Sequence, residues 1–285
     1  MSPAVSLTNS LLGFPDDARL LIINADDFGM CGAVNDGILD AFAAGVVTST
    51  TLMVPWPGAA EAMRLLQEHP DLPFGVHLTA VCDMVDYRWG PLTPGDRVTS
   101  LIDETGHFHG LERLREFLPR LKLDELRVEF QAQIDAVLAS GLQPTHLDWH
   151  CLHNGGRADI LDMTLTLARE YCLALRVTDP PCVERLRRQG LPSNDHELLD
   201  SYTLDPAGKP ARYVELLREL PPGLSEWAVH PGFGNPELRA IEPNSWRVRQ
   251  TDHDFLVSSD AREIIREEGV LLLNYRPLQE LWRAG

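Results

Sequence analysis

Two adjacent aspartates, Asp26 and Asp27, end an apolar run that begins at Leu20. Strands buried in a parallel sheet read as continuous runs of Leu, Ile and Val, and the functional side chains of such sheets lie just beyond the carboxyl ends of the strands. Neighbouring carboxylates repel each other, which is tolerated when one of them binds a cation or has a raised pKa. A solvated turn or a helix N-cap also favours aspartate. The pair is therefore a candidate site or a cap.

Three further strand-like segments end in polar residues. In chain order these are His77, the alternating set His146, Asp148 and His150, and finally His230 before a Pro-Gly turn. Residues two or four apart on a strand share a face, so the alternating set is expected to point one way. In a parallel barrel all of these strand ends converge on one face. Taken singly, His77 could be a core histidine and His230 could only shape a turn.

Two imidazoles and one carboxylate make a facial metal site that leaves coordination positions open for water and substrate. A metal held in this way polarises a carbonyl and lowers the pKa of bound water. A second carboxylate nearby can accept a proton, and a histidine across the pocket can protonate a leaving amine. The strand ends of this chain supply every one of these groups, so they predict metal-assisted hydrolysis.

The elements that would position these groups alternate between strand and helix along the 285 residues. Strands are expected at 20–25, 46–54, 74–78, 144–150, 174–177, 225–230 and 270–273. Helices are expected at 32–44, 59–68, 111–140 with a break near 122–124, 160–171, 213–220 and 258–268. This order predicts an α/β fold of βαβ units. No GxGxxG motif follows the first strand, which argues against a Rossmann sheet. We therefore expect a single domain, 1–285, built as an irregular (β/α) barrel of about seven parallel strands.

Three segments between these elements are expected to be loop insertions near the site, over the C-terminal face of the barrel. They are 82–110, 180–210 and 233–255, which are rich in proline, glycine and polar residues. The first is too long for a simple connection, which is typical of a functional loop.

The net charge of −17 argues against nucleic acid or an anionic membrane as a partner, because both favour Lys and Arg. No run approaches the ~20 apolar residues of a membrane span. Residues 1–14 do not resemble a signal peptide. The five cysteines are scattered and never form CxxC, which excludes a disulfide framework and a thiolate zinc site. We therefore expect a cytoplasmic protein with reduced thiols.

The same segments resemble the YdjC/ChbG family of carbohydrate deacetylases. The resemblance rests on four motifs in family order: Asn-Ala-Asp-Asp-Phe-Gly at 24–29, Gly-Val-His-Leu at 75–78, Thr-His-Leu-Asp-Trp-His at 145–150 and His-Pro-Gly at 230–232. Together they span nearly the whole chain, and the first is the most specific. The arrangement is also similar to that of the broader polysaccharide deacetylases.

This resemblance implies a (β/α) barrel that removes an N-acetyl group from an amino sugar with the help of one divalent metal ion. By position, Asp27, His77 and His150 look like the metal ligands, Asp26 like the catalytic base and His230 like the general acid. Magnesium or zinc is the first choice of metal, with manganese, cobalt or nickel as alternatives. A small carbohydrate is the implied substrate, and the family makes a homodimer an expectation.

Five further residues are candidates for substrate binding or for support behind the site: His146, Asp148, His153, Trp89 and Arg88. Many family members continue the fourth strand as a histidine-rich run, whereas this chain has Leu152 and Asn154 there. This departure concerns the choice of sugar more than the metal. Two alternative hypotheses remain: a metal-dependent hydrolase that acts on another amide or ester, and a non-catalytic sugar-binding barrel.

Overall fold

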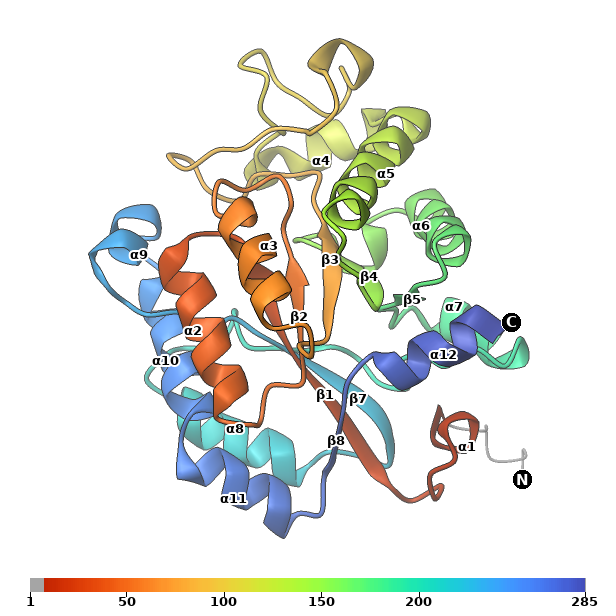
Figure 1. Cartoon of the computed structure of the whole chain (residues 1–285), viewed down its shortest axis with the longest axis vertical. Coiled ribbons are helices and arrows are strands. Elements are labelled where there is room, and N and C mark those ends of the chain that lie inside the picture. Colours follow the sequence, from red (N-terminus) through yellow and green to blue (C-terminus); the bar gives the residue numbers. More distant parts are fainter. Residues whose placement is uncertain (1–7, 285) are drawn as a thin grey trace.

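A curved, all-parallel sheet organises the computed structural model, which describes residues 8–284 (Figure 1). Its strand order is β5-β4-β3-β2-β1-β7-β6, and β8 also pairs with β1. The strands are β1 Arg19–Phe28, β2 Ser49–Leu52, β3 Phe74–Leu78, β4 His146–Trp149, β5 Ala174–Leu175, β6 Leu199–Asp200, β7 Gly223–Val229 and β8 Leu271–Leu273. Among the described residues no pairing joins β5 to β6. The expected irregular (β/α) barrel in one α/β domain is thus confirmed, as an open curved sheet.

Strand β1 is the centre of the sheet and pairs with three other strands. One edge pairs with β7 from Arg19 to Ala25, while the other edge is shared by β8 near its start and β2 near its end. The side chains from Leu20 to Ala25 are buried in the core. Within the core this strand is apolar apart from Asn24, as is typical of a strand covered on all sides, and the two aspartates appear only at its carboxyl end.

The helices surround the outside of the sheet (Figure 1). Six correspond to expected helices: α2 Gly32–Ala43, α3 Ala59–Glu68, α5 Leu123–Ala139, α6 Ala158–Glu170, α8 Lys209–Arg218 and α11 Ser259–Glu267. The others are α1 Thr8–Leu12, α4 Leu114–Phe117, α7 Pro180–Arg188, α9 Pro236–Ile241, α10 Trp246–Leu256 and α12 Arg276–Ala284, with 3-10 turns at 95–97, 111–113, 118–120 and 153–155. Within residues 8–284 no helix is both long and apolar enough to cross a bilayer.

Two of the expected loops differ from the structure, because 180–210 contains α7 and β6, and 233–255 contains α9 and most of α10. Helix α7 begins at two prolines. Asp179 precedes them and is the N-cap of the helix, because its carboxylate accepts a hydrogen bond from the Cys182 N–H at 3.0 Å. Asn235 caps α9 in the same way, again before a proline. Proline fits the first turn of a helix, so these prolines mark helix starts rather than irregular chain.

The 82–110 segment does follow the expected course, without an α-helix, beyond the carboxyl end of β3. It is held by the bridges between Cys82 and Gly110 and between Ile102 and Phe108. A buried carboxylate also holds the segment: Glu129 of α5 accepts hydrogen bonds from two of the segment's backbone N–H groups, at 3.0 and 2.9 Å. A buried charged group ties this segment to the body of the domain.

Removing this tie should destabilise the protein. In Glu129→Ala the N–H groups of Leu92 and Thr93 lose their acceptor, and we expect the free energy of unfolding in urea to fall by about 3 kcal/mol. Glu116→Ala is the matched control, because Glu116 makes only an exposed pair with Arg113; its effect should stay below about 0.5 kcal/mol. Equal effects of the two variants would contradict the proposed tie.

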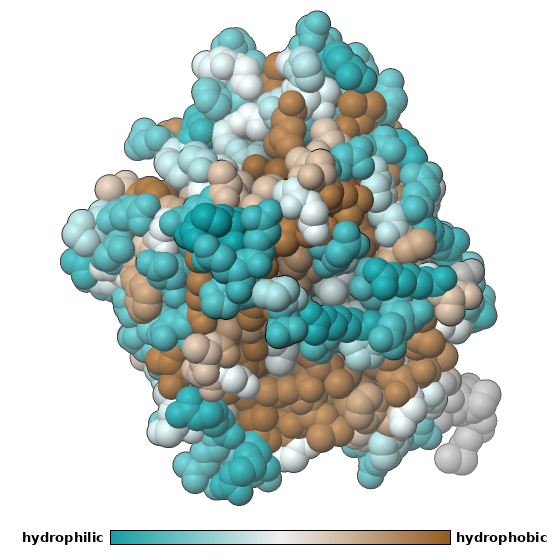
Figure 2. Space-filling model, viewed as in Figure 1, coloured by the Kyte–Doolittle hydropathy of each residue, from teal (hydrophilic) through white to brown (hydrophobic). Residues whose placement is uncertain are grey.

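The outer surface is mostly polar, with an apolar band across the lower part of the face seen in Figure 2. This band lies over the region in which Figure 1 shows β8. Leu271 of β8 is 42% exposed, one of the few large apolar side chains with that much accessible surface among the described residues. The apolar surface is therefore found near the amino-terminal half of β1, away from the two aspartates.

Candidate active site

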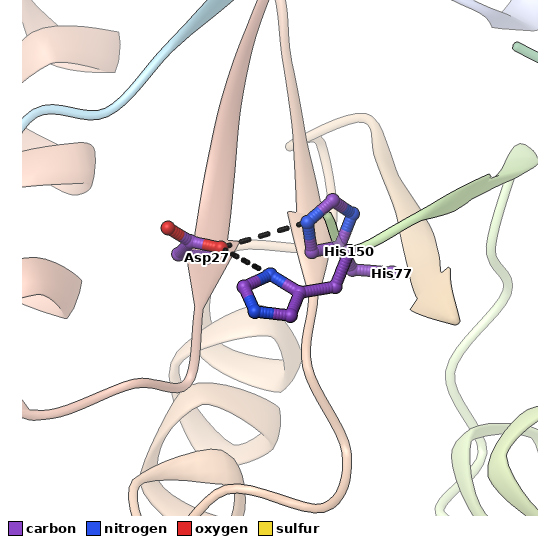
Figure 3. A group of neighbouring side chains, drawn as sticks. All are labelled: Asp27, His77 and His150. Carbon is purple, nitrogen blue, oxygen red and sulfur yellow. Dashed lines mark ion pairs between the residues drawn. The ribbon is translucent and has the colours of Figure 1, made fainter. Parts of the chain in front are cut away.

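Three side chains from separate strands meet at the carboxyl end of the sheet (Figure 3). The Oδ1 atom of Asp27 lies 3.5 Å from His77 Nε2 and 3.3 Å from His150 Nδ1. All three side chains are buried, and no donor among the described residues makes a hydrogen bond to this oxygen. A buried acceptor without a donor, facing two ring nitrogens, is the arrangement of a metal-binding group.

The backbone at Asp27 explains how both aspartates reach one cavity. Successive side chains on a regular strand point to opposite faces, so the sequence predicts that the two carboxylates diverge. Asp27 instead has a φ of 72°, in the left-handed region, and the Met30 N–H closes a turn onto its carbonyl. This turn ends the alternation of the strand, and Asp26 and Asp27 line the same cavity.

Each of the two histidine rings is held by a carboxylate on its other nitrogen. His77 Nδ1 lies 2.7 Å from Asp148 Oδ1, and His150 Nε2 lies 3.1 Å from Asp83 Oδ1. Such partners fix the tautomer and the direction of a metal-binding imidazole. Asp148 therefore lies behind His77, while Asp83 is a residue that no pattern in the sequence had marked.

The second aspartate, Asp26, is fixed by a buried arginine. Arg176, directly after β5, donates two hydrogen bonds to its carboxylate, at 2.8 and 2.9 Å, and also lies 2.8 Å from oxygens of Asp148 and Glu226. Burial opposes ionisation of Asp26, but the charge and hydrogen bonds of Arg176 outweigh it and hold its pKa below the usual value. The carboxylate is thus ionised and oriented.

The pKa values of Asp27 and His77 shift in opposite directions. Burial also opposes ionisation of Asp27, yet Arg249, whose Nη2 lies 2.8 Å from Asp27 Oδ2, keeps its pKa well below the ordinary range. Burial likewise disfavours protonation of His77, but the neighbouring carboxylates, Asp148 first among them, raise its pKa to about 9. Without a cation, protons on the imidazoles balance the negative charge of the site.

His230 lies directly after β7 on the wall of the same cavity. Its Nδ1 is 3.0 Å from Ser201 Oγ, and Ser201 donates a short hydrogen bond to Asp252. Asp252 also accepts from the His230 backbone N–H at 2.8 Å and from the buried Lys209 at 2.7 Å. A hydroxyl thus connects the imidazole to a buried carboxylate.

The cavity between these groups has a volume of about 660 Å³. Its polar floor contains the two aspartates, the two metal-type histidines and Arg176. Apolar and aromatic side chains form part of its walls, namely Leu111, Trp149, Leu152, Leu198 and Tyr202. A cavity of this size, in which polar groups converge beside apolar and aromatic walls, is typical of a small-molecule site.

The YdjC-like family model matches residues 20–267 of the chain, which include Asp26, Asp27, His77, His150 and His230. The chain belongs to the YdjC-like family. This YdjC-like protein is 40% identical over 267 residues to a carbohydrate deacetylase of Brevibacillus brevis, covering 90% of the chain and 99% of the relative. It is 34% identical to a carbohydrate deacetylase of Enterococcus faecalis, with 91% and 98% covered.

A solved structure gives the same result for the fold. A crystal structure of an Enterococcus faecalis protein, named for cellobiose-phosphate cleavage, superposes on the YdjC-like protein with a TM-score of 0.78 and 33% sequence identity. The match covers 92% of this chain and 99% of the other. The two proteins therefore share a fold over most of this chain.

His146 does not reach the cavity of the YdjC-like protein, although the alternating pattern placed it on one face with His150. Its ring stacks on Tyr275, with centroids 3.6 Å apart, and a Cβ added at Gly75 would lie 2.6 Å from it. Burial first, and then Arg176, lowers its pKa well below the usual value, so the ring is neutral. The alternating pattern therefore predicted the direction of the His146 side chain. It did not predict that the ring would be buried between Gly75 and Tyr275 and not line the cavity.

Neither of the two residues named from the 82–110 segment lines the cavity. Trp89 is buried against Trp56, with centroids 4.5 Å apart, and its ring meets the edge of His150. Arg88 pairs with Asp103 of its own segment at 2.7 Å and does not line the cavity.

His153 lines the cavity and lies 3.1 Å from the Thr178 hydroxyl. The residues that sequence reasoning missed are mostly buried partners: Asp83, Arg176, Ser201, Glu226, Arg249 and Asp252. Only Arg176 had a usable signal, a charged residue inside the apolar run 174–177.

Proposed function

We propose that this YdjC-like protein is a metal-dependent carbohydrate deacetylase, which hydrolyses the N-acetyl group of an amino sugar or short oligosaccharide. The observation that carries this proposal is the meeting of Asp27, His77 and His150 in one cavity with Asp26 and His230. The relatives named as carbohydrate deacetylases support the choice of bond and substrate class.

The three proposed ligands fit a divalent cation. The unpaired Oδ1 of Asp27 and the ring nitrogens of His77 and His150 form a compact donor set of one oxygen and two nitrogens. Such a set suits zinc, and also magnesium, manganese, cobalt or nickel to differing degrees. When bound, the metal supplies Lewis-acid chemistry, by polarising the acetamide carbonyl and stabilising the negative charge that develops on its oxygen.

The remaining residues move the protons. Asp26, held ionised by Arg176, is the base that accepts a proton from the attacking water, and its Oδ2 lies 4.0 Å from His77 Nε2. His230 donates a proton to the nitrogen of the leaving amine. Ser201 engages Nδ1 of His230, so Nε2 is the atom available to the substrate.

The Ser201 contact predicts a kinetic effect. Without its hydroxyl, His230 loses the connection to Asp252, and we expect Ser201→Ala to lower kcat about tenfold with KM little changed. Steady-state rates of acetate release measure this effect. Ser259→Ala, at an exposed helix position, is the matched control. A normal kcat in Ser201→Ala would show that the proton donor does not depend on this contact.

Metal affinity should depend on pH, because the cation replaces protons on the imidazoles. The pKa of metal-free His77 is raised to about 9, so below that pH the proton must leave before the nitrogen can bind. Each imidazole proton that is displaced contributes about a tenfold fall per pH unit, so we expect the affinity to fall by at least about tenfold for each unit between ~8 and ~6. Competition with a chelator at several pH values measures it, and a constant affinity would contradict the proposed ligand.

The function itself is tested by acetate release from a panel of N-acetylated mono- and oligosaccharides. The protein is stripped with EDTA and each candidate metal is added back. We expect no acetate from the stripped protein and restored turnover with at least one metal. Release from simple esters or other amides alone would favour a different hydrolase, and bound metal without any hydrolysis would favour a non-catalytic sugar-binding protein.

A further inference from the structure

The ring of His150 faces two separate groups of donors. Its Nδ1 points to Asp27, while its Nε2 lies 3.1 Å from Asp83 Oδ1 and 3.3 Å from Cys151 Sγ. The donor atoms of Asp83, His150 and Cys151 all lie within 4.8 Å of one another, as do those of Asp27, His77 and His150. One imidazole therefore belongs to two clusters of metal-type ligands.

The need to orient the His150 ring explains the contact with Asp83, but it does not explain why Cys151 also lies beside the same nitrogen. On the other ring of the site, Asp148 alone holds the free nitrogen of His77, in a fully buried place. Around His150, Asp83 already makes the equivalent contact, and the thiol is an additional donor. Cys151 is exposed and lines the cavity, so a cation can reach it from solvent.

We propose that Asp83, His150 and Cys151 form a second metal site, which takes thiophilic divalent cations such as Cd²⁺ or Zn²⁺. Thiolate and imidazole select soft and borderline metals, in contrast to the harder donor set around Asp27. As the metal binds, the thiol proton of Cys151 and the Nε2 proton of His150 are both released to solvent, and the metal takes the place of the hydrogen bond between Nε2 and Asp83. This site does not depend on the proposed deacetylation.

The two sites are antagonistic, because they share one ring. A neutral imidazole has a single nitrogen lone pair free for a metal, and binding at both nitrogens requires loss of the second ring proton. Occupation of the second site by a soft cation should therefore weaken the hold of the first site on its own metal.

Cadmium is the probe for this site, because a thiolate bound to Cd²⁺ gives an ultraviolet charge-transfer band. Titration of the purified full-length protein should produce this band. Cys151→Ser should abolish it, and so should Cys151→Gly, which tolerates the φ of 56° at this position. Asp83→Asn should keep the band with affinity at least about tenfold lower. Cys172→Ser is the matched control, since Cys172 is the other exposed cysteine of the described residues.

A further variant separates the two sites. His77→Gln removes a ligand of the first trio but none of the second, so the band should persist. Several results would overturn the proposal: no band in the wild-type protein at saturating Cd²⁺, a full band in both Cys151 variants, loss of the band in Cys172→Ser, or its loss in a folded His77→Gln variant. The last result would assign the thiol to the first site.

Discussion

The Asp26→Asn variant is expected to lose turnover while it keeps its metal. Asparagine has nearly the shape of aspartate, and its amide oxygen can still accept a hydrogen bond from Arg176, but it cannot accept a proton from water. General base catalysis contributes roughly 10²- to 10⁴-fold, so we expect kcat to fall by about that factor. None of the three proposed ligands is changed, and metal content should remain near that of the wild-type protein.

The environment of Asp26 adds a pH criterion to this test. Because Arg176 holds the pKa of Asp26 below its usual value, the base stays ionised throughout the neutral and mildly acidic range. Any loss of wild-type activity on acidification to about pH 5 should then come from protonation of the histidines proposed as metal ligands. A variant with normal kcat and bound metal would mean that another carboxylate of the cavity, such as Asp83, is the base.

The Asp27→Asn variant should lose both metal and turnover. The change removes the charged oxygen that faces His77 and His150, and removal of a ligand should weaken metal binding by more than the roughly 10- to 100-fold seen when supporting residues change. Metal content after gel filtration and acetate release are the two measurements. We expect kcat/KM to fall by at least about 10³-fold.

Two features make this variant interpretable. Arg249, the buried partner of Asp27, also makes hydrogen bonds to Glu242 at 3.0 Å, so its charge keeps a carboxylate partner and the fold should survive. Asp83→Asn changes a carboxylate of the same cavity that is outside the trio, and its loss of metal affinity should be smaller. If Asp27→Asn retained metal and Asp83→Asn did not, the ligand assignment would be wrong.

Seven of the eight strands, all but the two-residue β6, and the residues at their ends were predictable from the sequence, because both follow from local patterns. Continuous apolar runs identify buried parallel strands, and a parallel fold places their carboxyl ends on one face. Asp27, His77 and His150 could therefore be grouped without knowledge of any contact. The resemblance to a known family assigned their expected roles, which remain predictions here.

The partners behind the site were not predictable in this way. Arg176 reaches Asp26 across 150 positions of sequence, and Arg249 reaches Asp27 across 222, with no spacing rule to relate them. The depth of His146 also depends on the register between neighbouring strands, which periodicity does not define. The helices in 180–188 and 236–256 were missed because their polar sequences and prolines resemble loops.

Arg176 has a consequence for anyone who wishes to engineer this protein. It follows β5, at one margin of the sheet, and its guanidinium contacts carboxylates from β1, β4 and β7. The same contacts that orient Asp26 therefore hold strands together beside the unpaired margin between β5 and β6. Lysine lacks the planar fork needed to serve three carboxylates at once. A substitution of Arg176 is therefore expected to change the catalytic rate and the thermal stability together.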